Sequence, residues 1–149
     1  MNKYPLSPKL FFDIYSKVPR LCVDLVIKSN EGILLAKRSI EPCKGFWHLP
    51  GGTIFKKEKI ADAILRVAKE ETGLVVKTKK LLGHIEFLNE IRSNTDIRFH
   101  SVSIVIEVKP TSNDFRPDEN ASELKYFKKL PSKMIKEQKE FLKDFYPNI

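Results

Sequence analysis

The chain has 149 residues and a formal net charge of +8, with 42% hydrophobic and 31% charged residues. This length suits one domain, 1–149, built around one core. The composition excludes a disordered chain, and the lack of an apolar run of about 18 residues excludes a membrane-spanning helix.

The charge, the cysteines and the N-terminus further limit the classes of protein to which the chain can belong. A basic chain attracts polyanions such as nucleic acid or a phosphate-rich substrate. Its lysines, however, lie in short clusters typical of a solvated surface, and no zinc-finger spacing, aromatic RNA-binding motif or basic zipper occurs, so we expect no nucleic-acid partner. Cys22 and Cys43 make no disulfide framework, and residues 1–9 do not resemble a signal peptide. These features predict a reduced, cytoplasmic protein.

The first part of the chain predicts a helix followed by a hairpin. Residues 8–17 have an amphipathic pattern, with Ser7 placed to cap the helix and Pro8 suited to its first turn. Apolar residues alternate along 21–28, which indicates a strand. The turn 29–32 and the stretch 33–38 then predict a hairpin and its return strand.

The rest of the chain predicts strands with helices between and after them, an α/β fold whose mixed sheet is covered by helices. Within 59–72, Ile60, Ile64 and Val67 recur at helical spacing and predict the face that packs on the core, and Gly73 is suited to end that helix. The expected elements are a loop at 39–46, a strand at 46–49 stopped by Pro50-Gly51-Gly52, a loop at 53–58, a helix at 59–72, strands at 74–78, 81–89 and 98–108, a loop at 112–120, a strand at 124–127 and a helix at 132–145.

The segment 51–74 contains the residues best suited to catalysis. Its glycine pair permits a tight bend that brings backbone carbonyls close to a ligand. On the helix that follows, Glu70 and Glu71 are about 100° apart around the axis, so both can lean toward one point. Arg66 lies one turn before Glu70 and can pair with it. Carboxylate and carbonyl oxygens suit Mg²⁺ or Mn²⁺, with phosphate oxygens and waters as the remaining ligands.

This segment resembles the Nudix box, whose pattern is glycine, five residues, glutamate, seven residues, arginine-glutamate, an aliphatic residue, any residue, two glutamates, any residue, glycine and an aliphatic residue. The resemblance implies a Nudix-type α/β/α sandwich with a mixed β-sheet, and a magnesium-dependent hydrolase acting on a nucleoside diphosphate linked to another moiety. Gly52, Glu58, Arg66 and Gly73 would be the structural residues of the box. The residues in register are Gly52, Glu58, Arg66, Ala68, Glu70, Glu71, Gly73 and Leu74.

One position departs from the pattern. The family's glutamate after the arginine, which is thought to bind metal or act as base in many members, is Val67 here. The replacement removes one carboxylate and, we expect, one metal. It leaves open a domain that binds nucleotide without turnover.

The runs 23–26, 31–38 and 42–52 are similar to the GDP-mannose mannosyl hydrolase branch of the family, which also lacks that glutamate. This branch cleaves the bond between a phosphate oxygen and the anomeric carbon, with inversion and a single Mg²⁺, whereas most of its relatives attack phosphorus. The resemblance implies a nucleotide sugar as substrate. It also implies a homodimer that involves the N-terminal helix.

The resemblance assigns a role to residues on both sides of the box. The carbonyl of Gly51 and the carboxylate of Glu71 would hold the metal. Arg38 would contact the diphosphate, Asp24 would lie near the reacting groups, and Phe11 would stack on the base.

Two further positions differ from the branch. Asn120 and Ala121 stand where the branch has a glutamine and a histidine, which give it a metal ligand and its general base. The amide oxygen of Asn120 can still bind the metal, whereas Ala121 cannot accept a proton. The branch's arginine after the glycine pair is Thr53 here.

The general base and the exact function stay open. Glu119, Glu123 and Glu70 are the candidate bases, and Glu70 is also a candidate metal ligand. Besides a nucleotide-sugar hydrolase, the alternatives are a nucleoside triphosphate pyrophosphatase, which usually needs the glutamate that Val67 replaces, and a catalytically idle binding module.

Structural roles compete with several of these assignments. Glu58 is better suited to pair with Arg66 than to bind metal, and Arg38 can equally be a surface residue at a strand end. Asp24 lies in an apolar strand, where a buried carboxylate needs partners. Phe11 can belong to the core. The three histidines lie in strand patterns that favour structural roles: His48, His84 and His100.

Overall fold

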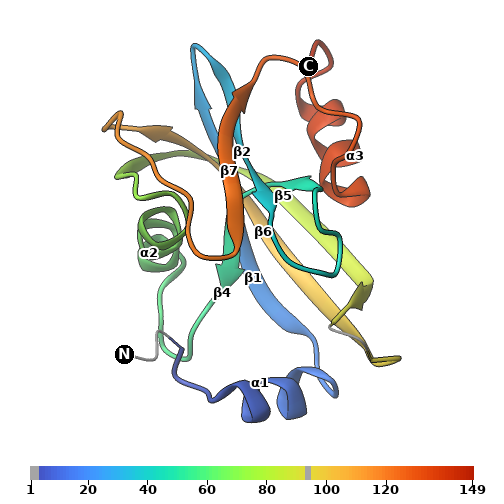
Figure 1. The fold of residues 1–149 in the computed structure, drawn as a ribbon. Helices are drawn as coiled ribbons and strands as arrows, with labels where there is room; N and C mark the ends of the chain where they lie inside the picture. The colour runs from blue at the N-terminus through green and yellow to red at the C-terminus, as the bar shows by residue number, and fades with distance from the viewer. Residues whose placement is uncertain (1–3, 93–94) are drawn as a thin grey trace.

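The computed structural model describes residues 4–92 and 95–149. Within this part of the chain the elements are, in order, α1 (Pro8–Tyr15), β1 (Arg20–Ser29), β2 (Gly32–Arg38), β3 (Trp47–His48), β4 (Gly51–Thr53), α2 (Ile60–Thr72), β5 (Val76–Ile91), β6 (Arg98–Pro110), β7 (Ala121–Phe127) and α3 (Lys136–Phe145). They form the mixed α/β fold that the sequence predicts, with α2 and α3 on either side of the sheet (Figure 1).

β1 lies at the centre of the sheet. It runs parallel to β6 along most of its length, and its segment around Asp24 is also antiparallel to β4. With β2 it pairs at the hairpin turn, and beyond that turn β2 takes β3 and β7 as neighbours. β1 and β2 therefore diverge. The connection from β3 to β4 lies beside β1 at this point, where the N–H of Leu25 donates to the carbonyl of Pro50 at 2.8 Å.

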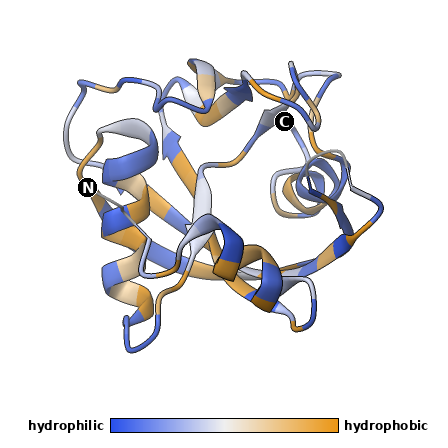
Figure 2. Ribbon diagram, turned by 60° about the horizontal axis from the view of Figure 1, so that its bottom comes forward, coloured by the Kyte–Doolittle hydropathy of each residue, from blue (hydrophilic) through white to orange (hydrophobic). Residues whose placement is uncertain are grey.

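Two apolar clusters cover the two faces of the sheet. One contains Leu25 of β1 together with Ile64 and Val67 of α2, and the other contains Val26 of β1 together with Leu142 of α3. Adjacent strand residues point to opposite faces, so β1 contributes to both clusters. Each helix has hydrophobic and hydrophilic residues, as Figure 2 shows, and can turn one side to the sheet. Burying one such aliphatic side chain contributes roughly 1.5 to 3 kcal/mol.

Helix α2 matches its prediction closely, with one exception on its apolar face. Ile64 and Val67 are buried at 3% and 1% exposure, but Ile60 is 44% exposed, so its assignment to the core was wrong. Ala63, one residue before Ile64, is fully buried and contributes to that face instead. The helix ends at Gly73, whose φ of 77° is the left-handed conformation that favours glycine.

Helix α1 ends at Tyr15, two residues earlier than expected, and lies across the end of β1 (Figure 1). Its start follows the sequence prediction, because the Ser7 hydroxyl accepts from the N–H of Leu10 at 3.2 Å. The ring centroid of Phe12 lies 5.4 Å from that of Phe99 on β6. This aromatic contact attaches the helix to the sheet.

Two predicted strands, 74–78 and 81–89, form the single strand β5. The sequence suggested a break because Lys79 and Lys80 interrupt the apolar pattern. β5 is an edge strand, however, so polar side chains there remain in solvent, and even Leu81 is 68% exposed. The pairing with β6 continues through this region with shifts in register.

Two other boundaries differ from the prediction because of long-range backbone pairing. Gly51 and Gly52 do not stop the sheet, since they belong to β4 and pair with β1. α3 begins at Lys136 and not at 132. The segment before it bonds to β3 instead: the N–H of Trp47 donates to the carbonyl of Lys133, and the N–H of Ile135 donates to the carbonyl of Trp47.

Candidate active site

A cavity of about 830 Å³ opens where β1 and β2 diverge, with walls from α1, α2, β5 and α3 as well. Its volume lies within the range of about 300 to 1,000 Å³ that small-molecule sites occupy. The structure therefore brings together residues that are far apart in the chain. The candidate residues that line it are Phe11, Asp24, Arg38, Gly51, Gly52, Glu71 and Asn120.

The glycine bend fits tightly between β1 and α2. A Cβ on Gly51 would lie 2.3 Å from Oδ1 of Asp24 and 2.8 Å from the carbonyl oxygen of Val23. A Cβ on Gly52 would lie 3.2 Å from Cγ2 of Val67. Only glycine at position 51 lets β4 approach β1 this closely, and the packing of β4 on α2 puts Glu71 and the bend in one cavity.

Arg66 joins α2 to the loop before it. Its guanidinium donates to both carboxylate oxygens of Glu58 at 2.7 and 2.9 Å, to the carbonyl of Thr53 at 2.8 Å and to Glu70 at 3.1 Å. The hydrogen bond from Arg66 lowers the pKa of Glu58. Glu58 thus pairs with Arg66, as the sequence favours.

Glu70 does not reach the cavity. Its carboxylate accepts from Arg66, and the residue is not among the described residues that line the cavity. The two adjacent glutamates therefore diverge, because a step of about 100° around the helix is enough to turn one side chain to the loop and the other to the cavity. Glu70 is not brought to the place where its predicted roles as metal ligand and base require it.

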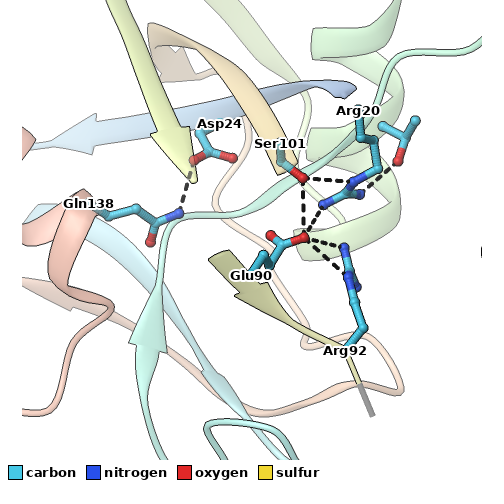
Figure 3. Close-up of polar contacts among 7 residues, drawn as sticks. Arg20, Asp24, Glu90, Arg92, Ser101 and Gln138 are labelled. Carbon is cyan, nitrogen blue, oxygen red and sulfur yellow. Dashed lines mark hydrogen bonds and ion pairs between the residues drawn. The ribbon is translucent and has the colours of Figure 1, made fainter. Parts of the chain in front are cut away.

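Asp24 is a buried carboxylate at 5% exposure. The amide of Gln138 on α3 donates to its Oδ2 at 2.9 Å (Figure 3). The oxygen of the same amide accepts from the N–H of Leu49 at 2.9 Å. Burial raises the pKa of Asp24 to about 6, although the hydrogen bonds of Gln138 and Ser103 act in the opposite direction. The partners that a carboxylate in an apolar strand needs are therefore present.

Arg38 and Asn120 meet where β2 approaches the loop before β7. Nε of Arg38 donates to the carbonyl of Pro42 at 2.7 Å, and its terminal NH₂ groups make no hydrogen bond with any residue the structure describes. Two hydrogen bonds fix the backbone of Asn120: its N–H donates to the carboxylate of Asp118 at 2.9 Å, and its carbonyl accepts from the N–H of Ser39 at 3.1 Å. Within the described chain its side-chain amide has no partner, so guanidinium and amide groups are both available to a ligand.

Phe11 belongs both to an aromatic cluster and to the cavity wall. Its ring centroid lies 4.8 Å from that of Tyr15 and 6.2 Å from that of Phe99. The guanidinium of Arg20 lies 5.8 Å from the same centroid. The predicted base platform and the core role are therefore compatible at this position.

A group of polar residues at one end of the cavity was not predicted. One oxygen of Glu90 accepts from Arg20 at 3.3 Å, from Arg92 at 2.9 Å and from Ser101 at 3.1 Å, as Figure 3 shows. Arg20 also donates to the hydroxyl of Thr53 at 2.8 Å. These residues come from β1, β4, β5 and β6 and from the position just after β5, and Arg20 and Ser101 are 81 positions apart in the chain. No local motif indicates their contact.

The oxygen donors in the cavity fit a hard divalent cation. Glu71 supplies a carboxylate, Gly51 lines the same cavity, and Asn120 offers an amide oxygen that has no partner among the described residues. Such oxygen ligands suit Mg²⁺, which often uses one or two carboxylates together with substrate phosphates. Across residues 4–92 and 95–149, no group of three or more His, Cys, Asp or Glu side chains is placed to hold a metal. Among these three oxygen donors, the carboxylate of Glu71 is the one charged group.

The family model for the NUDIX domain matches residues 18–148. The chain belongs to the Nudix family. This Nudix hydrolase is 38% identical over 115 residues to the low-salt glycan biosynthesis protein Agl8 of Haloferax volcanii, covering 76% of this chain and 74% of that protein. It is 34% identical over 129 residues to the ADP-ribose pyrophosphatase of Methanocaldococcus jannaschii, covering 85% of this chain and 73% of that protein.

Solved structures agree with this assignment. The MutT NUDIX hydrolase of Burkholderia pseudomallei superposes with a TM-score of 0.72 at 27% identity, over 85% of this chain and 98% of that chain. The predicted family and fold are therefore confirmed. Nudix hydrolases generally use divalent metals such as Mg²⁺. None of the helices in the described part of this chain is long and apolar enough to cross a membrane.

Proposed function

We propose that this Nudix hydrolase cleaves a nucleoside diphosphate linked to a sugar, with Mg²⁺ as cofactor. The observation that carries the proposal is that one cavity holds the glycine bend with Glu71 at one wall and the available guanidinium of Arg38 at another. A diphosphate between these walls would be bound by cation and guanidinium together. The cavity volume of about 830 Å³ also leaves room for a base and a sugar.

The cation would be held by the carbonyl of Gly51, the carboxylate of Glu71 and the amide oxygen of Asn120, and Mn²⁺ could replace Mg²⁺. When bound, it neutralises charge on the diphosphate, an effect worth several kcal/mol in the transition state. Arg38 clamps the diphosphate with its terminal NH₂ groups, because planar guanidinium matches phosphate geometry. These groups orient the substrate for attack by water.

Two other residues contact the substrate, one at the base and one near the reacting groups. Phe11, whose ring lines the cavity, provides a face for the base. Asp24 lies beside the bend, where its Oδ1 faces Gly51, and positions the groups that react. Its bond to Gln138 holds the carboxylate in one orientation.

The names of two relatives support this substrate class. One is a glycan biosynthesis protein and the other is a pyrophosphatase of ADP-ribose, itself a nucleoside diphosphate joined to a sugar. GDP-mannose is the substrate implied by the branch resemblance. Because Thr53 and Ala121 replace two residues of that branch, GDP-mannose is one member of the test panel and not the sole expected substrate.

The test is magnesium-dependent hydrolysis of a panel of nucleotide sugars, ADP-ribose and nucleoside triphosphates, followed by ³¹P NMR. We expect turnover of nucleotide sugars or ADP-ribose and loss of at least about 100-fold in kcat for Glu71→Gln. Reaction in ¹⁸O-labelled water locates the attacked atom, since the label enters either a phosphate or the sugar. Turnover restricted to triphosphates would establish the pyrophosphatase alternative, and binding without products would establish the idle module.

The assembly and the location of the protein remain predictions. The proposed homodimer involves α1, whose residues include the 45% exposed Leu10. Size-exclusion chromatography with light scattering measures it directly. Cys22 and Cys43 are free thiols, which suits the predicted cytoplasmic location.

A further inference from the structure

His48 lies on β3 next to the strand that carries Arg38. In the antiparallel pair β2–β3, His48 is opposite Ala36. Arg38 is two residues further along β2, so it points to the same face as Ala36 and His48. Diagonal neighbours of this kind are about 7 to 8 Å apart. The imidazole and the diphosphate-binding guanidinium thus share one wall of the cavity.

The hydrogen bonding of the ring defines its tautomer. Nδ1 of His48 lies 2.9 Å from the carbonyl oxygen of Leu49, which can only accept, so Nδ1 carries the hydrogen. Nε2 of the neutral ring is then an acceptor with a lone pair. No described residue bonds to Nε2. Among the described residues, every side-chain nitrogen or oxygen that is buried from solvent has a hydrogen-bond partner. Because Nε2 has none, it is exposed to the cavity that His48 lines.

Burial keeps this ring neutral. It is the largest effect and lowers the pKa of His48 below its ordinary value of 6.5, although the hydrogen bond to the carbonyl of Leu49 acts in the opposite direction. Arg38 from β2 lowers it further, whereas Asp118 from the loop before β7 raises it. From the side of α3, Glu137 also lines the cavity. The net direction is down, so the ring can accept a proton near pH 7.

We propose that His48 is the general base of this hydrolase, a role that rests on the proposed function. Nε2 takes a proton from the attacking water while the water oxygen forms a bond to the electrophilic phosphorus or anomeric carbon. The bond from that atom to the leaving oxygen breaks, and the oxygen departs with the electron pair as part of a phosphate. The imidazolium then returns its proton to solvent.

The other candidate bases are less well placed. Glu70 is bonded to Arg66, and neither Glu119 nor Glu123 is among the described residues that line the cavity. Asp24 lies between Gln138 and the glycine bend. His48 combines an open acceptor atom with a neutral ring, which is what abstraction of a proton from water requires.

The kinetic test compares His48→Gln with the wild-type enzyme on its best substrate of the panel. We expect kcat to fall by about 10² to 10⁴, because a general base typically contributes that factor. The part of the acid limb that is due to His48, expected below pH 6.5 in the wild-type profile of kcat against pH, should disappear, and a limb that remains belongs to Asp24, whose pKa is about 6. His100→Gln, on β6 and away from the cavity lining, is the matched control and keeps the wild-type rate.

Two measurements separate a base from a structural residue. Imidazole in the buffer should restore part of the rate of His48→Ala, which an effect on folding would not allow. In the metal-free wild-type protein, ¹⁵N NMR of the ring at pH 7 should show the neutral Nδ1–H tautomer, with signals that shift when a nucleoside diphosphate binds. A charged ring, or the Nε2–H tautomer, would overturn the proposal regardless of any variant.

The rates of wild type and His48→Gln together test the role of His48 separately from the proposed hydrolase activity. If wild type turns over nucleotide sugars and His48→Gln keeps both its rate and its acid limb, His48 is not the base and the function stands. If wild type hydrolyses no nucleoside diphosphate sugar at all, the proposed function is wrong and the base assignment is overturned with it.

Discussion

Replacing Arg66 with methionine removes the bridge that joins α2 to the glycine bend. The guanidinium makes two hydrogen bonds to Glu58, one to Glu70 and one to the carbonyl of Thr53, and it lies 3.8 Å from the ring centroid of Phe55. Methionine keeps much of the apolar volume but none of these donors. The variant therefore isolates the polar contribution.

The magnitude follows from the partial burial of the pair. The side chains of Arg66 and Glu58 are 19% and 13% exposed. Breaking a buried ion pair costs about 3 to 5 kcal/mol, and breaking an exposed one costs at most about 1. Because this pair is mostly buried and bidentate, we expect Arg66→Met to lower the free energy of unfolding by about 2 to 4 kcal/mol. For a domain of this size that corresponds to a fall in Tm of about 5 to 15 °C.

The assay is a double-mutant cycle with Glu58→Gln, in which urea unfolding is followed by circular dichroism. We expect a coupling energy between Arg66 and Glu58 of about 1 to 3 kcal/mol at pH 7. The pKa of Glu58 is lowered in the folded state, so this stabilisation is complete above the ordinary glutamate value of 4.5 and is lost as the pH falls through the folded pKa. Additive effects at pH 7 would refute the reasoning.

An exposed ion pair on α3 provides the matched control. Lys136 and Glu140 are 3.9 Å apart and are 82% and 65% exposed. Lys136→Met should change the free energy of unfolding by less than about 0.5 kcal/mol, since solvent screens such pairs. A loss as large as that of Arg66→Met would mean that removal of any helical cation is destabilising, and the argument from burial would fail.

Two other changes test the packing between β1 and β4. The pKa of Asp24 rises from 3.8 in the unfolded chain to about 6, so the folded state binds the proton more tightly and stability falls as the pH rises between these values. Asp24→Asn should remove that slope and raise stability at pH 7 by about 1 to 3 kcal/mol, measured by urea unfolding at several pH values; an unchanged slope would contradict the assigned pKa. Gly51→Ala should cost about 1 to 3 kcal/mol or more, because its Cβ would lie 2.8 Å from the backbone oxygen of Val23. Gly52→Ala should cost less, since its Cβ meets only the two methyl groups of Val67, at 3.2 and 3.9 Å. The reverse order of the two Tm values would show that the bend is not constrained in this way.

Local patterns in the sequence predicted the elements that depend on local physics. Helix α2 and its end at Gly73 follow from periodicity and from the freedom of glycine to adopt a positive φ. The hairpin follows from alternation around a polar turn. The Nudix box could be recognised because its spacing is fixed within a single loop and helix, so Glu58 and Arg66 were paired correctly without a structure.

Contacts between distant segments could not be predicted in this way. Gln138 reaches Asp24 across 114 positions, and Glu90 reaches Arg20 across 70. Each contact depends on which strands become neighbours, and the sequence pattern of one strand contains no information about its partner. The same applies to His48: the short apolar run 46–49 placed it in a strand, but only the pairing of β2 with β3 shows that its ring shares a wall with Arg38.

The residue at position 67 has a consequence for how the cation and the substrate would bind. Val67 is 1% exposed and packs beneath the glycine bend, so its methyl groups fill the space next to Gly52. Glu58 and Glu70 are both paired with Arg66. Glu71 is therefore the one carboxylate of the described Nudix box that lines the cavity, and the other proposed ligands, Gly51 and Asn120, are neutral. A cation with one carboxylate ligand retains most of its charge and attracts a diphosphate more strongly than a fully neutralised one would. The loss of a carboxylate thus favours a site in which the cation and the diphosphate bind together, and it does not by itself indicate an idle domain.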